Sequence, residues 1–489
     1  MKFKYIYLAL ALAAMSCEKA VDVAPLSVIT SPSFWKTQND VIGAINGLYV
    51  QFRKVTDQEL FLLGEARSEV LASALAGTVG LDKYYNQSLN VSNAGPSWAN
   101  IYQTINHANL LLKYVPNISF SNENEKNEIL AQAYSMRAFL YFVLTKTWGK
   151  VPVRIEPTEG YNPSTIQIER SEVADVFTLI KEDLEKALAL YPNSSMPTGR
   201  AKWSKPATLA LKGDVFLWTA KKLNGGTADL TTALDALLSV KTSSIELLSN
   251  YEDVFNYSNK GNSEILFAVR YQILESNNNI HEYMHYNASN LPSDISPAVR
   301  AAIGTIGSGN AGNSIMQVSS TVRNQFTNDD TRKLGTFYEV YSPTGTFFSA
   351  ITTKGNGFVE AGTRHFKDDV VIYRYGEVLL LIAEAKNALG QNPEAEINEI
   401  RKRAYGSNYN SHVFVNGDRV SNDEVILKER LFELTFEGKR WWDLIRFDKA
   451  FELVPALQGK DSQTHLLLFP VGSALRSLEP LVDENAGWE

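Results

Sequence analysis

The sequence predicts a mainly α-helical protein in which helical hairpins form a platform and one loop-rich segment interrupts them. Apolar residues recur at helical spacing along most of the chain. Two successive predicted helices start at Ser171 and Pro206, about 34 residues apart, which is the period of a tetratricopeptide helix pair. Glycine is concentrated in residues 301–365, which hold 9 of the 30 glycines and therefore cannot form long helices.

Local signals place the helices of the first half. Asp40 is the expected N-cap of a helix that runs to about Arg53, and Ser121 or Asn122 is the expected cap of a helix that ends at Gly149. The remaining helices are predicted over residues 98–115, 171–190, 206–223 and 229–240.

The second half begins with an expected insertion. Residues 255–365 are rich in Gly, Ser, Thr and Asn, with short strands such as 265–271. Helices resume over 369–389 and from Pro393 to Ala404, which gives about four hairpins in all. We therefore expect a helical part at 34–240, a loop-rich ligand-binding insertion at 241–368 and a helical C-terminal part at 369–489.

The first residues have the form of a secretory signal peptide. Lys2 and Lys4 precede the apolar run 5–15, which is shorter than the roughly 20 residues that a membrane-spanning helix needs. Residues 14–17 (Ala-Met-Ser-Cys) resemble a bacterial lipobox, which implies cleavage before Cys17 and lipidation of its thiol. The alternative is an ordinary free cysteine. We expect a signal peptide at 1–16 and a lipidated tether at 17–33.

Composition limits the classes of function. The net charge is −7, and removal of residues 1–16 leaves 45 basic against 54 acidic residues, a net charge of −9. An acidic chain without basic clusters argues against nucleic acid as a partner. Because Cys17 is the only cysteine, disulfides and thiolate metal sites are excluded.

A charged block at 423–448 has two interpretations. Glu429, Glu433 and Glu437 are spaced four apart, as in a carboxylate cluster for acid–base catalysis. The structural interpretation, which we favour, is that arginines neutralise the carboxylates while apolar neighbours pack inward. The expected pairing arginines are Arg430, Arg440 and Arg446, the expected carboxylates are Glu433, Glu437 and Asp443, and the expected core residues are Trp441, Trp442, Leu444 and Ile445.

The same block resembles the C-terminal signature of the SusD/RagB family of nutrient-uptake lipoproteins, E-R-x-x-E-L-x-F-E-G-x-R-W-x-D-L-x-R, here spanning residues 429–446. Further family-like pieces occur in order at 33–49, 98–112, 133–153, 373–390 and 397–404. The resemblance implies a lipid-anchored, non-enzymatic protein on the outer face of the outer membrane. We expect no catalytic residue, no cofactor and no catalytic metal site, and the sequence leaves a structural Ca²⁺ undecided. It implies capture of oligosaccharides or polysaccharide, or in some members peptides, and delivery to a SusC-like TonB-dependent transporter.

Two loop regions carry the aromatic and amide side chains that a sugar site needs. The first, 77–98, holds Tyr84, Tyr85, Asn86, Gln87 and Asn93. The second, 275–358, holds Tyr283, Tyr286, Asn287, Tyr338, Tyr341, Phe347 and Phe348. The ligand-binding candidates are Tyr84, Tyr85, Asn86, Tyr283, Tyr286, Tyr338 and Tyr341.

One motif favours a different class of protein. His281-Glu282-Tyr283-Met284-His285 matches H-E-x-x-H, the pattern of a zinc metallopeptidase in which both imidazoles bind Zn²⁺ and the glutamate activates water. The motif needs a helix, but asparagines and Pro292 flank it. We therefore expect loop histidines rather than a zinc site, and binding without catalysis.

Overall fold

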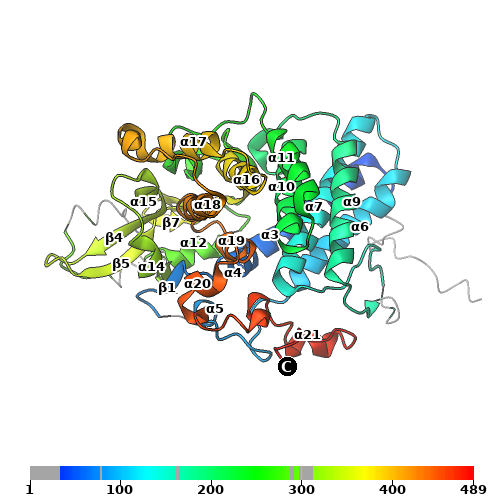
Figure 1. The fold of residues 1–489 in the computed structure, drawn as a ribbon. Coiled ribbons are helices and arrows are strands. Elements are labelled where there is room, and N and C mark those ends of the chain that lie inside the picture. The colour runs from blue at the N-terminus through cyan, green and yellow to red at the C-terminus, as the bar shows by residue number, and fades with distance from the viewer. Residues whose placement is uncertain are drawn as a thin grey trace, which may run out of the picture.

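Long helices pack against one another in chain order and form the platform that the sequence predicts. The computed structural model describes residues 34–77, 80–160, 162, 166–276, 278–286, 291–296, 299 and 312–489. Figure 1 shows the helices of the first half standing side by side, with the strands gathered on the opposite side of the molecule. The helices of the platform are α3 (Gln38–Asp57), α4 (Glu59–Gly64), α6 (Ala99–Tyr114), α7 (Glu123–Trp148), α9 (Val173–Leu190), α10 (Lys205–Lys222), α11 (Gly226–Leu238), α16 (Tyr375–Ala388), α17 (Glu394–Tyr405) and α18 (Arg419–Leu434).

Helix α7 lies at the centre of this platform. It packs between α6 and α9, and every residue from Ala138 to Trp148 is buried. Burial of each large apolar side chain contributes roughly 1.5–3 kcal/mol. The long helices and their packing in chain order confirm the mainly helical fold class with tetratricopeptide-like pairing.

In the first half of the chain, the predicted cap of α7 is observed, whereas that of the first helix is not. Asn122 caps α7 by accepting a hydrogen bond from the backbone of Asn124, as predicted. The cap of α3 is Thr37 and not Asp40, because Asp40 occupies the third helical position and completes a reciprocal capping box with Thr37. The predicted N-terminal segment, including Cys17, lies outside the described residues, as does Asn287.

Short strands and single-turn helices make up the loop-rich segment and its partners. The strands pair antiparallel as β1 with β3, β2 with β8, β4 with β5 and β6 with β7. Their bounds are β1 (Leu71–Ser73), β2 (Ile265–Val269), β3 (Met316–Val318), β4 (Phe337–Tyr341), β5 (Phe347–Thr352), β6 (Phe358–Glu360), β7 (Thr363–His365) and β8 (Val370–Arg374). The short helices are α5 (Asp82–Tyr85), α12 (Asn279–Met284), α14 (Ser320–Arg323), α15 (Thr331–Thr336), α19 (Arg440–Arg446), α20 (Ala450–Leu453) and α21 (Ser473–Leu478).

One predicted helix begins with a strand. The sequence predicts a helix over 369–389, but Val370–Arg374 forms β8 and the helix starts only at Tyr375. The β-branched residues Val370, Val371 and Ile372 favour a strand. They pair with the fully buried strand β2, and this long-range partner decides the conformation.

A sharp turn separates α18 from α19 inside the charged block. Phe436 and Gly438 both have positive φ, at 70° and 72°, so the helix that carries Glu429 and Glu433 does not continue to Glu437. At this turn the chain touches α4 closely. A side chain on Gly64 would place its Cβ 1.9 Å from the carbonyl oxygen of Gly438, so only glycine allows the contact.

The glutamates of this block lie in a buried ion cluster, which we call the Glu433 cluster: Glu433, Glu437, Glu264, Arg374 and Arg403. The Nη1 atom of Arg374 lies 2.5 Å from Glu433 Oε1 and 2.8 Å from Glu264 Oε1, and its Nη2 lies 2.8 Å from Glu437 Oε1. Arg403 also pairs with Glu433, and its Nη1 lies 3.0 Å from Glu264 Oε2. Burial alone would raise the pKa of Glu433, but the surrounding arginines outweigh it and the pKa is lowered.

The structural interpretation of the block is confirmed, although Arg440, Glu433 and Glu437 pair with residues outside the predicted set. Arg430 and Arg446 pair with Asp443, at 2.8 and 3.0 Å, and Trp441, Trp442, Leu444 and Ile445 are buried. Glu433 and Glu437 instead pair with Arg374, and Arg440 pairs with Glu69 at 2.6 Å. The turn at 435–439 places α19 beside α18, so Arg430 meets Asp443, whereas Glu433 and Glu437 pair with Arg374 from another part of the chain.

We expect the substitution Glu433→Gln to lower the free energy of unfolding by about 3–5 kcal/mol, because it leaves buried arginines without their counter-charge. Urea unfolding at pH 7 measures this loss. The control is Glu182→Gln, whose exposed pair with Lys186 contributes about 0.5 kcal/mol or less. A loss below about 1 kcal/mol for Glu433→Gln would show that the cluster is not a major source of stability.

Candidate ligand-binding surface

The first predicted loop region is held in place by a buried arginine. Arg67 donates from Nε and Nη2 to Gln87 Oε1, at 2.9 and 2.6 Å, and from Nη1 to the carbonyl oxygen of Leu468 at 2.9 Å. Its guanidinium also lies over the rings of Trp441 and Phe469, 4.6 and 4.9 Å from their centroids. Burial lowers the pKa of Arg67 to about 9. Gln87, predicted as a sugar partner, is therefore a buried support for the loop.

Strand β1, which lies just before the first predicted loop region, pairs with β3 of the second. Ala72 pairs with Gln317, and Leu71 with Val318. The Gln317 side chain then joins the strands on either side, because its Nε2 donates to the carbonyl oxygen of Ser73 at 2.7 Å and its Oε1 accepts from the backbone of Ala350 in β5 at 2.9 Å. Segments that are more than 240 residues apart in sequence thus form one surface.

Aromatic side chains stand at both ends of this surface. At one end, the Tyr85 hydroxyl lies 2.8 Å from Ser73 Oγ. At the other end, Tyr341 packs edge-on against Phe347, with ring centroids 5.8 Å apart. Aromatic side chains thus lie beside both the β1–β3 pair and the β4–β5 hairpin.

A charged group accompanies the aromatic rings. The Arg323 guanidinium lies over the Phe347 ring, 3.7 Å from its centroid, and its Nη1 lies 3.0 Å from Glu339 Oε1. Glu339 also pairs with Lys333 at 2.9 Å. Burial alone would raise the pKa of Glu339, but bonds to these two cations outweigh it and the pKa is lowered. We call Ser73, Tyr85, Gln317, Arg323, Tyr341 and Phe347 the β1–β3–β5 surface.

The structure separates the predicted ligand residues into exposed and buried sets. Tyr341 is 43% exposed, Asn86 is exposed, and Tyr85 is half-buried. Tyr84 and Tyr286 are each only 3% exposed, so neither offers a ring face to a sugar. Tyr84 packs against Phe469, and Tyr286 against Val340 and Ile351.

The remaining candidates are half-buried. The Tyr283 hydroxyl accepts a hydrogen bond from Gln58 at 3.2 Å, and Tyr338 packs against the cluster of Tyr286. Phe347 was named with the second loop region, whereas sequence reasoning missed Arg323, Gln317 and Ser73. For Gln317 a signal was present, because a single polar residue between Met316 and Val318 is typical of a short strand with one solvent face.

The H-E-x-x-H motif lies on a short helix, contrary to the expectation of a loop. Helix α12 contains His281, while His285 follows it as an extended C-cap residue. The two imidazoles have different partners. His281 Nδ1 lies 3.9 Å from Asp368 Oδ2, and His285 Nε2 lies 2.8 Å from Asn356 Oδ1. Within the described part of the chain, no three His, Cys, Asp or Glu side chains gather as a metal site would require.

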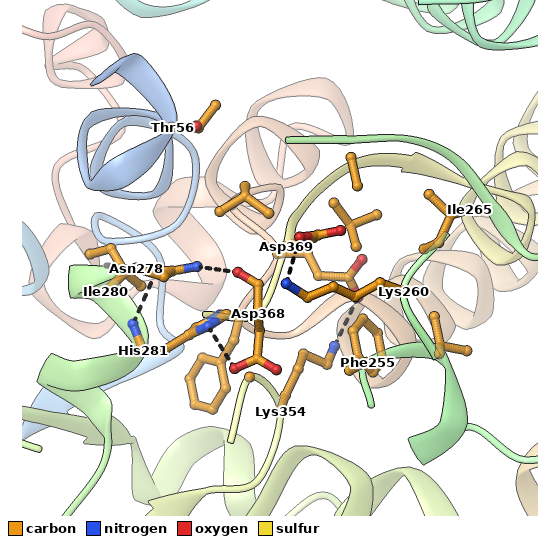
Figure 2. Close-up of a pocket in the computed structure, with 18 of the residues that line it drawn as sticks. Thr56, Phe255, Lys260, Ile265, Asn278, Ile280, His281, Lys354, Asp368 and Asp369 are labelled. Carbon is orange, nitrogen blue, oxygen red and sulfur yellow. Dashed lines mark hydrogen bonds and ion pairs between the residues drawn. The ribbon is translucent and has the colours of Figure 1, made fainter. Parts of the chain in front are cut away.

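His281 lines a cavity beside β2 and β8, shown in Figure 2. Its volume is about 60 Å³, room for about four water molecules and too little for a sugar ring. Asn278, His281 and Asp368 point toward one another across it (Figure 2). Asp368 Oδ2 accepts from the backbone of Gly357 at 2.6 Å, whereas Oδ1 has no hydrogen-bond partner among the described residues.

Burial perturbs both titratable groups of this cavity. It raises the pKa of Asp368 to about 7 and lowers the pKa of His281 to about 4, with the charge of Lys354 adding to the second shift. Near neutral pH the imidazole is therefore uncharged. The stability of the fold therefore decreases as pH rises from about 4 to 7, because the carboxyl ionises in the unfolded chain while folded Asp368 is still protonated.

We expect Asp368→Asn to stabilise the protein at pH 8 and to have little effect at pH 4. The amide removes the buried charge and still accepts from Gly357. The gain is at most a few kcal/mol, since one pKa unit corresponds to about 1.4 kcal/mol. Thermal unfolding at both pH values tests this, with Asp461→Asn on the exposed surface as control. Equal effects at pH 4 and pH 8 would contradict the proposed titration.

Two family models match parts of this chain. Residues 358–465 match a model described as the SusD family, and residues 31–217 match one described as starch-binding associating with outer membrane. Among the described residues, no helix combines the length and apolar character needed to cross a membrane.

Relatives and solved structures resemble the chain over nearly its whole length. A SusD-like protein, P38, of Formosa agariphila is 27% identical and aligns over 91% of this chain and 90% of its own. The structure of NanU of Bacteroides fragilis is 30% identical, with a TM-score of 0.81, and covers 96% of this chain and 100% of its own. A SusD superfamily protein of Bacteroides vulgatus is 28% identical, also with a TM-score of 0.81, covering 93% and 100%. The chain belongs to the SusD family.

Proposed function

We propose that this protein captures oligosaccharides or polysaccharide at the cell surface and holds them at the β1–β3–β5 surface. The observation that carries the proposal is that β1 pairs with β3 and that Gln317 of β3 reaches β5, which links Tyr85, hydrogen-bonded to Ser73, with the β4–β5 hairpin that carries exposed Tyr341. Rings supply faces for sugar C–H groups, and Arg323, Ser73 and Asn86 supply hydrogen bonds for hydroxyls. The matched family description, starch-binding associating with outer membrane, supports the same ligand class.

In this proposal the protein binds and releases its ligand without catalysing a reaction. The carboxylates of the Glu433 cluster are paired with arginines, and the two histidines of the H-E-x-x-H motif have separate partners. The bound glycan passes to a SusC-like TonB-dependent transporter, the partner that the family resemblance implies. The test is co-purification of such a transporter with the tagged protein from native membranes; isolation without one would contradict it.

We also propose that lipidated Cys17 holds the protein at the outer membrane, facing outward. Two or more acyl chains give stable anchoring, because each buried CH₂ contributes about 0.8 kcal/mol. The substitution Cys17→Ser should move the protein from the membrane fraction to the soluble fraction. Retention of the serine variant in the membrane would contradict the anchor.

We expect Tyr85→Ala and Phe347→Ala each to weaken glycan binding at least about tenfold, a loss of about 1.4 kcal/mol or more. Calorimetric titration with starch, laminarin and their oligosaccharides measures the affinity. The matched control is Tyr409→Ala, a half-buried tyrosine beside α17 that should keep wild-type affinity.

The result can contradict the proposal in two ways. Unchanged glycan affinity in both variants would refute the site. Binding of mixed peptides in place of every glycan would move the protein to the peptide-capturing alternative and make the pair of histidines the next residues to substitute.

A further inference from the structure

A second, larger groove lies on the helical side of the molecule. Its volume is about 540 Å³, within the roughly 300–1,000 Å³ typical of small-molecule sites. Figure 1 shows α6 and α21, which form part of it, on the opposite side of the molecule from β1, β4 and β5. The groove is lined by residues of α6, of 154–158, of 166–167 and of the end of α21, among them Tyr102, Asn106, His107, Glu156, Gln167 and Leu478.

Hydrogen bonds to the backbone hold the walls of the groove in position. The Tyr102 hydroxyl donates to the carbonyl oxygen of Pro152 at 2.6 Å, and Asn109 Nδ2 donates to that of Arg154 at 3.0 Å. Asn106 Oδ1 accepts from the backbone of Thr158 at 2.6 Å. Three side chains of one helix therefore tie down the facing segment, and the groove exists before any ligand binds.

Several polar side chains of the groove are left without hydrogen bonds. The His107 ring, the Glu156 carboxylate and the Gln167 amide make none to any other residue that the structure describes. Burial lowers the pKa of His107, and the nearby charge of Lys54 adds to the shift, so the imidazole is neutral at pH 7. The groove thus offers donors and acceptors that its own walls do not use.

The charges of the groove exclude an anion as the preferred ligand. Its arginine, Arg154, is already paired with Glu479 at 2.8 Å, and Glu156 adds a negative charge. Leu478, which is 79% exposed, and Ile166 form an apolar lip. Neutral amide and imidazole groups beside apolar carbon match a ligand that carries hydroxyls on a C–H framework.

We propose that this groove is a second binding site for a short neutral saccharide, separate from the β1–β3–β5 surface. The inference goes beyond capture at a single surface, because a polysaccharide held at two positions dissociates more slowly than one held at either. Linking two weak sites through one chain can raise the overall affinity by about 10²–10⁴-fold when the chain spans both.

The test uses variants of the groove in two backgrounds. Glu156→Ala/Gln167→Ala removes two side chains that form no hydrogen bond to any of the described residues. The matched control is Glu424→Ala/Gln391→Ala, the same residue types on the surface near α16 and α18. Both pairs are made in the wild-type protein and in the Tyr85→Ala/Phe347→Ala variant. Calorimetry uses maltotriose, laminaritriose and cellotriose as neutral probes, with glucuronate and spermidine as charged ones.

We expect the Tyr85→Ala/Phe347→Ala variant to retain binding of at least one neutral trisaccharide. The groove variant should weaken this residual binding at least tenfold, and the control pair should change it less than twofold. Absence of residual trisaccharide binding, residual binding that the groove substitutions do not alter, or groove-dependent binding of only glucuronate or spermidine would each overturn the proposal. If the β1–β3–β5 surface does not bind glycan, the Tyr85→Ala/Phe347→Ala variant keeps the full wild-type affinity. That result differs from each of the results that would overturn the groove.

Discussion

The Glu433 cluster is the interaction on which the arrangement of this protein depends. It joins the start of β2 through Glu264, the end of β8 through Arg374, helix α17 through Arg403 and helix α18 through Glu433. Each of these groups is almost fully buried, so removing it from water is costly and only the mutual pairing offsets that cost. The cluster therefore joins the loop-rich segment to the helical platform through buried pairs, and separating them would leave buried charges without partners.

The position of the ligand-binding surface follows from this cluster through Lys354. This lysine follows β5, and its Nζ lies 2.8 Å from Glu437 Oε1 and donates to the carbonyl oxygen of Thr435 at 2.7 Å. One end of β5 is thus fixed to the turn between α18 and α19, while its other end carries Phe347. On the far side, Arg67 fixes the loop of Tyr85 to the same C-terminal core. Rigid support of loops from a common core is the usual way in which binding residues are positioned.

Local patterns in the sequence predicted the helices well, and long-range contacts explain what they missed. Capping residues and apolar spacing located α6, α7, α9 and α10 within about two residues. Strand β8 was missed because its partner β2 lies about 100 residues earlier, and the partner of Glu433 was missed because Arg374 lies 59 residues away. The loop tyrosines could be named from composition, but only the fold distinguishes buried Tyr84 and Tyr286 from exposed Tyr341. The β1–β3–β5 surface and the groove beside α6 were beyond prediction, since each combines segments that are distant in sequence.

Hydrogen–deuterium exchange with and without bound oligosaccharide tests the central claim most directly, using the glycan that calorimetry identifies as the tightest ligand. Backbone amides that a ligand covers or rigidifies exchange more slowly, and the method locates them in the intact protein. The account predicts slower exchange in both 71–93 and 316–349, the two segments that form the β1–β3–β5 surface. Saturating glycan that leaves both segments unchanged would contradict the account.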